Sequence, residues 1–254
     1  MNRIVILGAG YAGLAAATSL AGRTRRRSDV RITVVNADER FTERLRLHQT
    51  ASGQRLADLR IPDLLAGTGV EFVRGWVTGV DAAARRVRID DERVLEYDRL
   101  VYALGAVADT AAVPGVDENA YTLDSAHDAD LLARRLAGLG GGTVVVCGSG
   151  LTGVECAAEI AERHPGLDVV LVGRQEPGAT MTPGARAHLR RALARLGVRV
   201  VSGVEVVKVL PESVELAGGD SVPADVVLWT SGVRVPPLAA AAGLAVDERG
   251  RIVT

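Results

Sequence analysis

Two copies of the glycine pattern GxGxxG are the residues whose type and spacing point most directly to chemistry. In each copy an aliphatic run precedes the glycines and an alanine-rich stretch follows them. The first glycine permits a tight turn, the second lets a pyrophosphate approach the backbone, and the third lets helix and strand pack closely. The helix that follows offers N–H groups and a positive dipole end to phosphates. The chain therefore predicts two dinucleotide sites, at Gly8, Gly10, Gly13, Gly148, Gly150 and Gly153.

The residue that ends the second strand of such a site usually selects the ribose. After the run 31–35 the chain has Asn36, whose amide can still bond a free ribose hydroxyl. After the run 169–172 it has Gly173 and Arg174, with no acid. A guanidinium in place of a carboxylate suits a 2′-phosphate, so the second site is expected to favour NADPH. The alternative, which the residues leave open, is that Arg174 is a solvated loop side chain.

These motifs require parallel sheets covered by helices, and aliphatic and alanine-rich segments alternate along the chain in that manner. Buried strands are expected at 4–7, 31–35, 100–104, 143–147, 169–172 and 226–229. Helices are expected at 10–21, 125–136, 150–163 and 183–196. Three shorter alternating segments, 70–75, 76–80 and 86–89, predict a small antiparallel meander. The fold class is therefore α/β, with two Rossmann-like dinucleotide-binding domains, each a parallel sheet with helices and a small meander.

Composition and charge exclude several classes of protein. The chain has 254 residues, 48% of them hydrophobic, which is enough for one large or two modest domains with a proper core. The net charge of −1 provides no basic field for nucleic acid. Two cysteines make no disulfide framework and fit a reducing cytoplasm. No apolar run reaches the length of about 18 residues that a membrane span needs, and no metal-ligand cluster is evident, so a soluble cytoplasmic protein without metal is expected.

The segments around the glycines resemble those of a known enzyme family. Residues 97–105 read YDRLVYALG, residues 224–233 read ADVVLWTSGV, and the second glycine pattern continues as GxGxxGxE. In this order the motifs are similar to those of the pyridine nucleotide-dependent flavoprotein reductases, most closely the type II NADH dehydrogenases. The resemblance covers essentially the whole chain. It implies an FAD-binding domain at 1–111 and 233–254, with an NAD(P)H-binding domain at 112–232 inserted in it.

The same resemblance implies a reaction and the residues that serve it. Hydride passes from NAD(P)H to FAD, and the electrons leave to a small-molecule acceptor, often a quinone. FAD is expected to contact Gly8, Gly10, Tyr11, Ala12, Gly13, Asn36, Ala37, Arg44, Val77, Ala103, Leu104 and Gly105. NAD(P)H is expected to contact Gly148, Gly150, Leu151, Thr152, Gly153 and Arg174.

Two further positions are implied near the stacked rings of the cofactors. Gly232 stands where a loop returns towards these rings, and Glu155 corresponds to an acid near the nicotinamide–flavin contact. Glu155 is thus the expected catalytic residue, and the alternative is an ordinary first-turn acid favoured by the helix dipole. The segment 41–49 stands in place of the family's flavin-facing loop, and its lone His48 is interpreted as a structural hydrogen-bonding residue.

Two departures from the family pattern matter. Disulfide reductases carry a CxxxxC motif after the second strand, whereas residues 36–60 contain no cysteine, so we expect no protein disulfide to relay the hydride. Cys147 and Cys156 are expected to be ordinary core residues. Family members also continue beyond the segment that ends this chain, into a glycine–aspartate motif for the flavin and a domain for membrane docking, quinone access or dimerisation. A homodimer and peripheral membrane association are therefore expectations for a full-length form.

Two alternatives stand beside the FAD-dependent oxidoreductase. One is a non-catalytic nucleotide-binding fragment or regulatory module that does not retain flavin. The other is a dehydrogenase that uses NAD(P) alone, which is disfavoured because it leaves the first glycine pattern and the loop 98–105 without a role.

Overall fold

The computed structural model describes residues 1–253, which form two compact units. Unit 1 comprises Met1–Glu43, Ala57–Val107 and the residues from Arg234 onward, and unit 2 comprises Arg44–Leu56 and Ala108–Val233. Two of the four divisions, after Val107 and after Val233, lie within a few residues of the expected domain boundaries. The other two enclose residues 44–56, which belong to unit 2 and were expected with the first domain.

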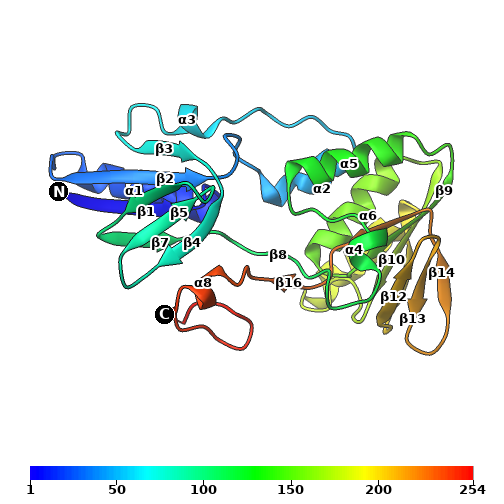
Figure 1. Ribbon diagram of the computed structural model, residues 1–254. Helices are drawn as coiled ribbons and strands as arrows, with labels where there is room; N and C mark the ends of the chain where they lie inside the picture. The colour runs from blue at the N-terminus through cyan, green and yellow to red at the C-terminus, as the bar shows by residue number, and fades with distance from the viewer. Residues whose placement is uncertain (254) are drawn as a thin grey trace. The chain divides into compact units, whose positions relative to one another are not determined.

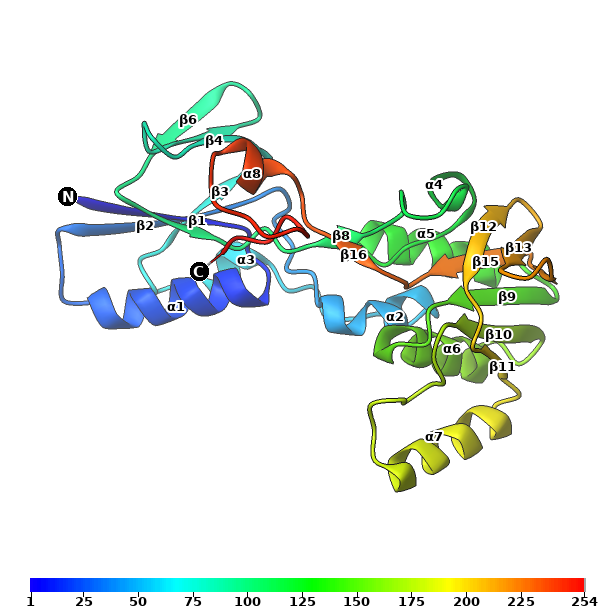
Figure 2. The ribbon, with the colours of Figure 1, turned by 90° about the horizontal axis from the view of Figure 1, so that it is seen from below.

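Unit 1 is built on a four-stranded parallel sheet in the order β3-β2-β1-β7 (Figure 1). Its strands are β1 (Asn2–Leu7), β2 (Val30–Asn36), β3 (Glu71–Arg74) and β7 (Arg99–Tyr102). The helix α1 (Tyr11–Thr24) connects β1 to β2 and lies along one face of the sheet (Figure 2). Ile4 and Ile6 pack on that face, while Val5 and Leu7 pack on the other. Burial on both faces explains why β1 is a continuous aliphatic run.

A separate antiparallel sheet covers the second face of the unit 1 sheet. It consists of β4 (Val77–Asp81), β5 (Arg86–Ile89) and β6 (Arg93–Glu96). The prediction that 70–75 belongs to this meander was wrong, because Glu71–Arg74 pairs in parallel with the end of β2. A short alternating segment shows one buried face whichever sheet it joins, so the pattern alone does not identify its partner. Unit 1 also contains the short helices α3 (Ile61–Leu64) and α8 (Leu238–Ala241).

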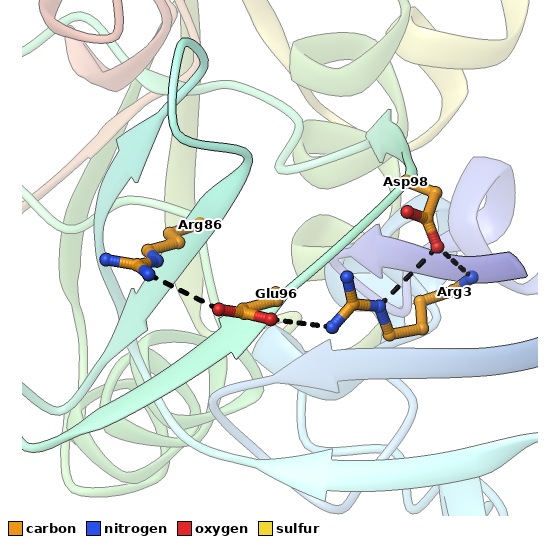
Figure 3. A network of polar contacts seen from close by, with 4 residues as sticks. All are labelled: Arg3, Arg86, Glu96 and Asp98. Atoms are coloured by element: carbon orange, nitrogen blue, oxygen red, sulfur yellow. Dashed lines mark hydrogen bonds and ion pairs between the residues drawn. The ribbon is translucent and has the colours of Figure 1, made fainter. Parts of the chain in front are cut away.

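An ion-pair network joins the two sheets of unit 1 (Figure 3). The Arg3 guanidinium lies 2.7 Å from Glu96 and 3.5 Å from Asp98, and Arg86 lies 3.3 Å from the other oxygen of Glu96. Asp98 also accepts the Arg3 backbone N–H at 2.7 Å, and this bond and the neighbouring guanidinium hold the pKa of its carboxyl below the ordinary range. The aspartate of the segment YDRLV, residues 97–101, therefore has a structural role at the start of β1.

Unit 2 repeats the plan of unit 1. Its parallel sheet has the order β11-β10-β9-β15, which matches β3-β2-β1-β7 position by position. The strands are β9 (Gly142–Cys147), β10 (Leu167–Gly173), β11 (Arg199–Ser202) and β15 (Val226–Trp229). Asp225 accepts the backbone N–H of Thr143 at 2.7 Å, as Asp98 does with Arg3. The repeated sheet order confirms the predicted α/β fold with two Rossmann-like sheets.

Helices cover one face of the unit 2 sheet and a small antiparallel sheet covers the other. The helices are α5 (Ala126–Ala137), α6 (Leu151–Arg163) and α7 (Pro183–Arg195), with the short α4 (Val116–Asn119) beside β12. The antiparallel strands are β12 (Val206–Leu210), β13 (Ser213–Leu216) and β14 (Ser221–Pro223). Where the chain passes between the units, β8 (Val107–Ala108) pairs with β16 (Val233–Arg234).

Residues 44–56 join unit 2 because their apolar side chains complete its core. The segment forms a 3-10 turn at Arg44–Arg46 and the helix α2 (Leu47–Ala51), which lies against α5 and α6. Leu47 and Ala51 are 2% and 1% exposed within the cluster formed by those helices. Gln54 donates to Glu159, and the His164 ring contacts the Ser52 carbonyl at 3.2 Å. No periodicity in the sequence indicates this packing, because the partners are distant along the chain.

Candidate dinucleotide sites

The second glycine pattern forms one wall of an open cavity in unit 2, with a volume of about 860 Å³. The carboxyl ends of β9, β10 and β15 form its floor, as expected for ligand sites of open parallel sheets. Residues of the segments that precede α7 and lead into β12 also line the cavity, among them Glu176, Gly178–Thr180 and Val204–Val206. Of the residues expected to contact NAD(P)H, those that line the cavity are Gly148, Gly150, Leu151 and Arg174. Gly232, expected near the stacked rings, also lines it. Thr152, exposed at the start of α6, and the buried Gly153 do not line the cavity.

The three glycines of the pattern do three different things. Gly148 has a φ of +122°, a left-handed conformation that favours glycine. A Cβ at Gly153 would overlap the carbonyl oxygen of Gly148, so this glycine permits the close packing of α6 on the turn. Gly150 is exposed and has no atom within 4 Å of a Cβ built on it. The open side of the turn is therefore at Gly150, where a pyrophosphate would approach.

The helix N-terminus behind each turn suits an anion. Helices α1 and α6 both begin after a glycine, and in these two described helices no side chain caps the N-terminus and no acid lies in the first turn. The first N–H groups and the positive dipole end therefore face the ligand side without competition from a carboxylate. Glu155 is the fifth residue of α6, so the alternative interpretation of it as a first-turn acid was wrong.

The first glycine pattern has the same geometry in unit 1. Gly8 has a φ of +93°, and a Cβ at Gly13 would overlap the Gly8 carbonyl. Gly10 is exposed, with no atom within 4 Å of an added Cβ, and Tyr11 and Ala12 beside it are exposed at the start of α1. The two turns are thus equivalent cradles that a side chain at the second glycine would fill.

Asn36 is committed to holding the turn of unit 1. Its Oδ1 accepts the backbone N–H of Ala9 at 2.9 Å, and its Nδ2 donates to the Asp38 carbonyl at 2.8 Å. In unit 2 the equivalent position, by strand register, is Gly173, and the bridging group is Ser149, whose hydroxyl donates to the Gln175 carbonyl at 2.6 Å. The same link is made by a strand-end side chain in one unit and by a turn side chain in the other. The expectation that Asn36 contacts ribose stays a prediction.

The remaining residues expected to contact FAD fall into two groups. Ala37 is the exposed residue after β2, Val77 opens the edge strand β4, and the loop 103–105 follows β7 beside Gly8. These belong to unit 1, as the glycines do. Arg44 belongs to unit 2, where its guanidinium lies 2.8 Å from Asp124. All the residues expected to contact FAD therefore lie in unit 1, except Arg44, which lies in unit 2.

Arg174 lines the unit 2 cavity together with three acids that the sequence analysis did not indicate, Asp109, Glu176 and Glu205. Its guanidinium lies 3.7 Å from Glu205, and Glu176 is a further carboxylate on the cavity wall. Glu205 precedes β12 and is distant from Arg174 along the chain, so the strand-end rule could not find it. Glu176 follows Arg174 by two residues and lies beyond the strand-end position that usually selects the ribose.

Glu155 has a partner that the sequence did not indicate. Its carboxylate lies 3.8 Å from Nδ1 of His48, which comes from α2. His48 is largely buried, with 14% of its side chain exposed, whereas Glu155 is 52% exposed. The pair is brought together because α2 packs on α6, and the role of Glu155 stays a prediction.

Both cysteines are unsuited to redox chemistry in the folded chain. Cys147 and Cys156 are free thiols that are 1% exposed. Burial raises the pKa of Cys147 to about 12 and also raises the pKa of Cys156. Since the thiolate is the reactive form, both are core residues, as predicted.

Comparisons with known proteins agree with this geometry. The model of the family described as pyridine nucleotide-disulphide oxidoreductase matches residues 2–254. An NADH dehydrogenase-like protein of Mycobacterium tuberculosis is 35% identical over 274 residues, which cover 99% of this chain and 68% of that protein. A type II NADH:quinone oxidoreductase of Staphylococcus aureus is 28% identical over 289 residues, covering 100% of this chain and 70% of that protein.

The solved structures show the same fold in longer chains. The NAD-dependent persulfide reductase from A. fulgidus has a TM-score of 0.83 and 26% sequence identity to this chain. The match covers 98% of this chain but 49% of that one, so the chain spans about half the length of this structural relative.

Proposed function

The chain belongs to the pyridine nucleotide-disulphide oxidoreductase family, and on that premise we propose that it acts as an FAD-dependent NAD(P)H oxidoreductase. The observation that carries the proposal is the pair of equivalent glycine cradles, one in each unit. A family of enzymes that uses two dinucleotides needs two such cradles. Unit 1 would hold FAD and unit 2 would hold NAD(P)H.

The residues of unit 1 fit the pyrophosphate of FAD. The open side of the turn at Gly10, the uncapped start of α1 and the absence of an acid in its first turn all favour an anion there. When bound, FAD supplies the chemistry that accepts a hydride from reduced nicotinamide and releases electrons to an acceptor. The chain itself contributes binding and orientation, and we assign no proton transfer to its side chains.

In unit 2 different residues would bind different parts of the nicotinamide dinucleotide. The turn at Gly150 and the start of α6 would receive its pyrophosphate. Arg174 would lie at the 2′ position of the adenosine ribose, because it follows the strand end that selects the ribose in such sites. The guanidinium there favours a 2′-phosphate, which is the basis for the predicted preference for NADPH.

The acceptor is proposed to be a small molecule of quinone type, by analogy with the named function of the Staphylococcus aureus relative. Residues 1–253 include no helix whose length and apolar character would let it cross a lipid bilayer. Peripheral association with a membrane, and a homodimer, are further proposals that rest on the family alone.

The test is a visible absorption spectrum of the purified chain, before and after addition of FAD, followed by anaerobic NADPH and NADH. A flavin spectrum that bleaches with either nucleotide would support the oxidoreductase. No flavin binding at saturating FAD would favour the alternative, a nucleotide-binding module that does not retain flavin. In a separate titration, Arg174→Glu should bind NADPH more weakly relative to NADH than the parent chain does. An unchanged preference would reject the role of this arginine.

A further inference from the structure

The ribose end of the unit 2 cavity contains opposed charges on two exposed side chains, Arg174 and Glu205. The backbone N–H of Val204 donates to the Gly173 carbonyl at 3.3 Å, which draws the segment before β12 against the end of β10. The carbonyl of Glu205 accepts the Ala217 N–H at 2.8 Å, so the backbone of Glu205 is held from both sides. From this backbone position its carboxylate lies 3.7 Å from the guanidinium of Arg174, and the side chains of Glu205 and Arg174 are 60% and 73% exposed.

We propose that Glu205 is a specificity-determining residue that opposes the binding of a 2′-phosphate at Arg174, so that the NADPH to NADH preference is set by this pair. The inference rests on the proposed function of unit 2 as the NAD(P)H site. A phosphate approaching Arg174 meets a carboxylate that already partners the guanidinium and repels the incoming charge. A free ribose hydroxyl meets no such repulsion, and a carboxylate can accept its hydrogen bond.

Glu205 thus supplies, from another element, the acid that is missing at the end of β10. In a usual dinucleotide site the acid ends the second strand, at the position that Gly173 holds here. Glycine is required at that position because a Cβ would overlap the Ser149 side chain. A carboxylate therefore cannot come from this position, and Glu205 places one beside Arg174 from a neighbouring segment.

Glu176, another acid that lines the cavity, serves as a matched control. Glu176 has the Ser202 hydroxyl 3.4 Å from its Oε1 and the Arg190 guanidinium 4.0 Å from its Oε2. Its charge is therefore offset by groups other than Arg174. Glu176→Gln removes the same charge from the same cavity without releasing Arg174.

The experiment is to measure the Kd of NADH and of NADPH by calorimetric titration of the purified chain and its variants. Glu205→Gln should strengthen NADPH relative to NADH by about tenfold, or about 1.4 kcal/mol, while the Kd for NADH changes less than about threefold. Glu176→Gln should shift the ratio by less than about threefold. In the Arg174→Ala background, Glu205→Gln should lose most of its effect, because the pair no longer exists.

The outcomes separate this inference from the proposed function. If the chain binds both nucleotides and Glu205→Gln leaves their ratio unchanged, Glu205 has no part in specificity. If Glu205→Gln and Glu176→Gln shift the ratio equally, the effect is one of overall charge and the pairing is rejected. If the parent chain and every variant bind neither nucleotide, the assignment of unit 2 as the NAD(P)H site fails, and the inference fails with it.

Discussion

The second and third glycines of the unit 2 turn, Gly150 and Gly153, differ in whether there is space for a Cβ atom, and a pair of alanine variants can test this difference. A Cβ at Gly153 would overlap the Gly148 carbonyl oxygen and lie 2.8 Å from the Thr230 hydroxyl, whereas a Cβ at Gly150 meets nothing within 4 Å. Gly150 has φ and ψ of −69° and 179°, which alanine adopts without strain. Gly153→Ala should therefore damage the fold, and Gly150→Ala should damage only the binding of a dinucleotide.

The expected loss of stability or of binding in each variant follows from the atoms that the added Cβ contacts. Overpacking against backbone that cannot shift costs about 3 kcal/mol, which lowers the Tm of a domain of this size by roughly 6–12 °C. Gly150→Ala should change stability by less than about 1 kcal/mol, because it also reduces the entropy of the unfolded chain. The methyl group on the open side of the turn should nevertheless weaken the binding of NADH by about tenfold or more, or at least about 1.4 kcal/mol.

The assay combines thermal unfolding, followed by circular dichroism, with an NADH titration of each variant. The corresponding pair in unit 1, Gly13→Ala and Gly10→Ala, repeats the comparison with FAD as the ligand. The reasoning is refuted if Gly150→Ala unfolds as early as Gly153→Ala. The assignment of the open side to the pyrophosphate is refuted if Gly150→Ala binds NADH as tightly as the parent chain.

Two further predictions concern stability. Leu47→Ala should destabilise unit 2 by about 2–5 kcal/mol in denaturant unfolding, because the Leu47 side chain packs in its core. The control is Leu45→Ala, at a side chain that is 73% exposed, which should change stability by less than about 0.5 kcal/mol. Equal effects of the two substitutions would contradict the packing of α2. Because the pKa of Cys147 is raised to about 12, its contribution to stability is complete below about pH 9 and decreases as the pH rises towards 12. Cys147→Ala should therefore reduce the loss of stability between about pH 8 and about pH 10, and an unchanged pH dependence would show that this thiol ionises normally.

The repeated architecture was predictable because local requirements dominate it. A turn that must bring a helix back against its strand needs glycine at the positions of Gly8 and Gly13, and the same spacing returns at Gly148 and Gly153. Strands buried on both faces must be aliphatic, so their positions could be predicted to within a few residues. Both aspartates of the later motifs, Asp98 and Asp225, also repeat, although their role in holding the first strand became clear only from the hydrogen bonds.

The sequence by itself determined the fold class, the two glycine turns between strand and helix, and the family. Tertiary structure alone decided three other matters: the pairing of Glu71–Arg74 with β2, the attachment of α2 to unit 2, and the carboxylate that faces Arg174. Each of these three features depends on which surface, distant along the chain, a short segment packs against. The hydrophobic pattern of a short segment is too brief to predict that surface. Glycine patterns are readable because the backbone conformation they permit is local, whereas an ion pair such as Arg174 with Glu205 exists only once the chain has folded.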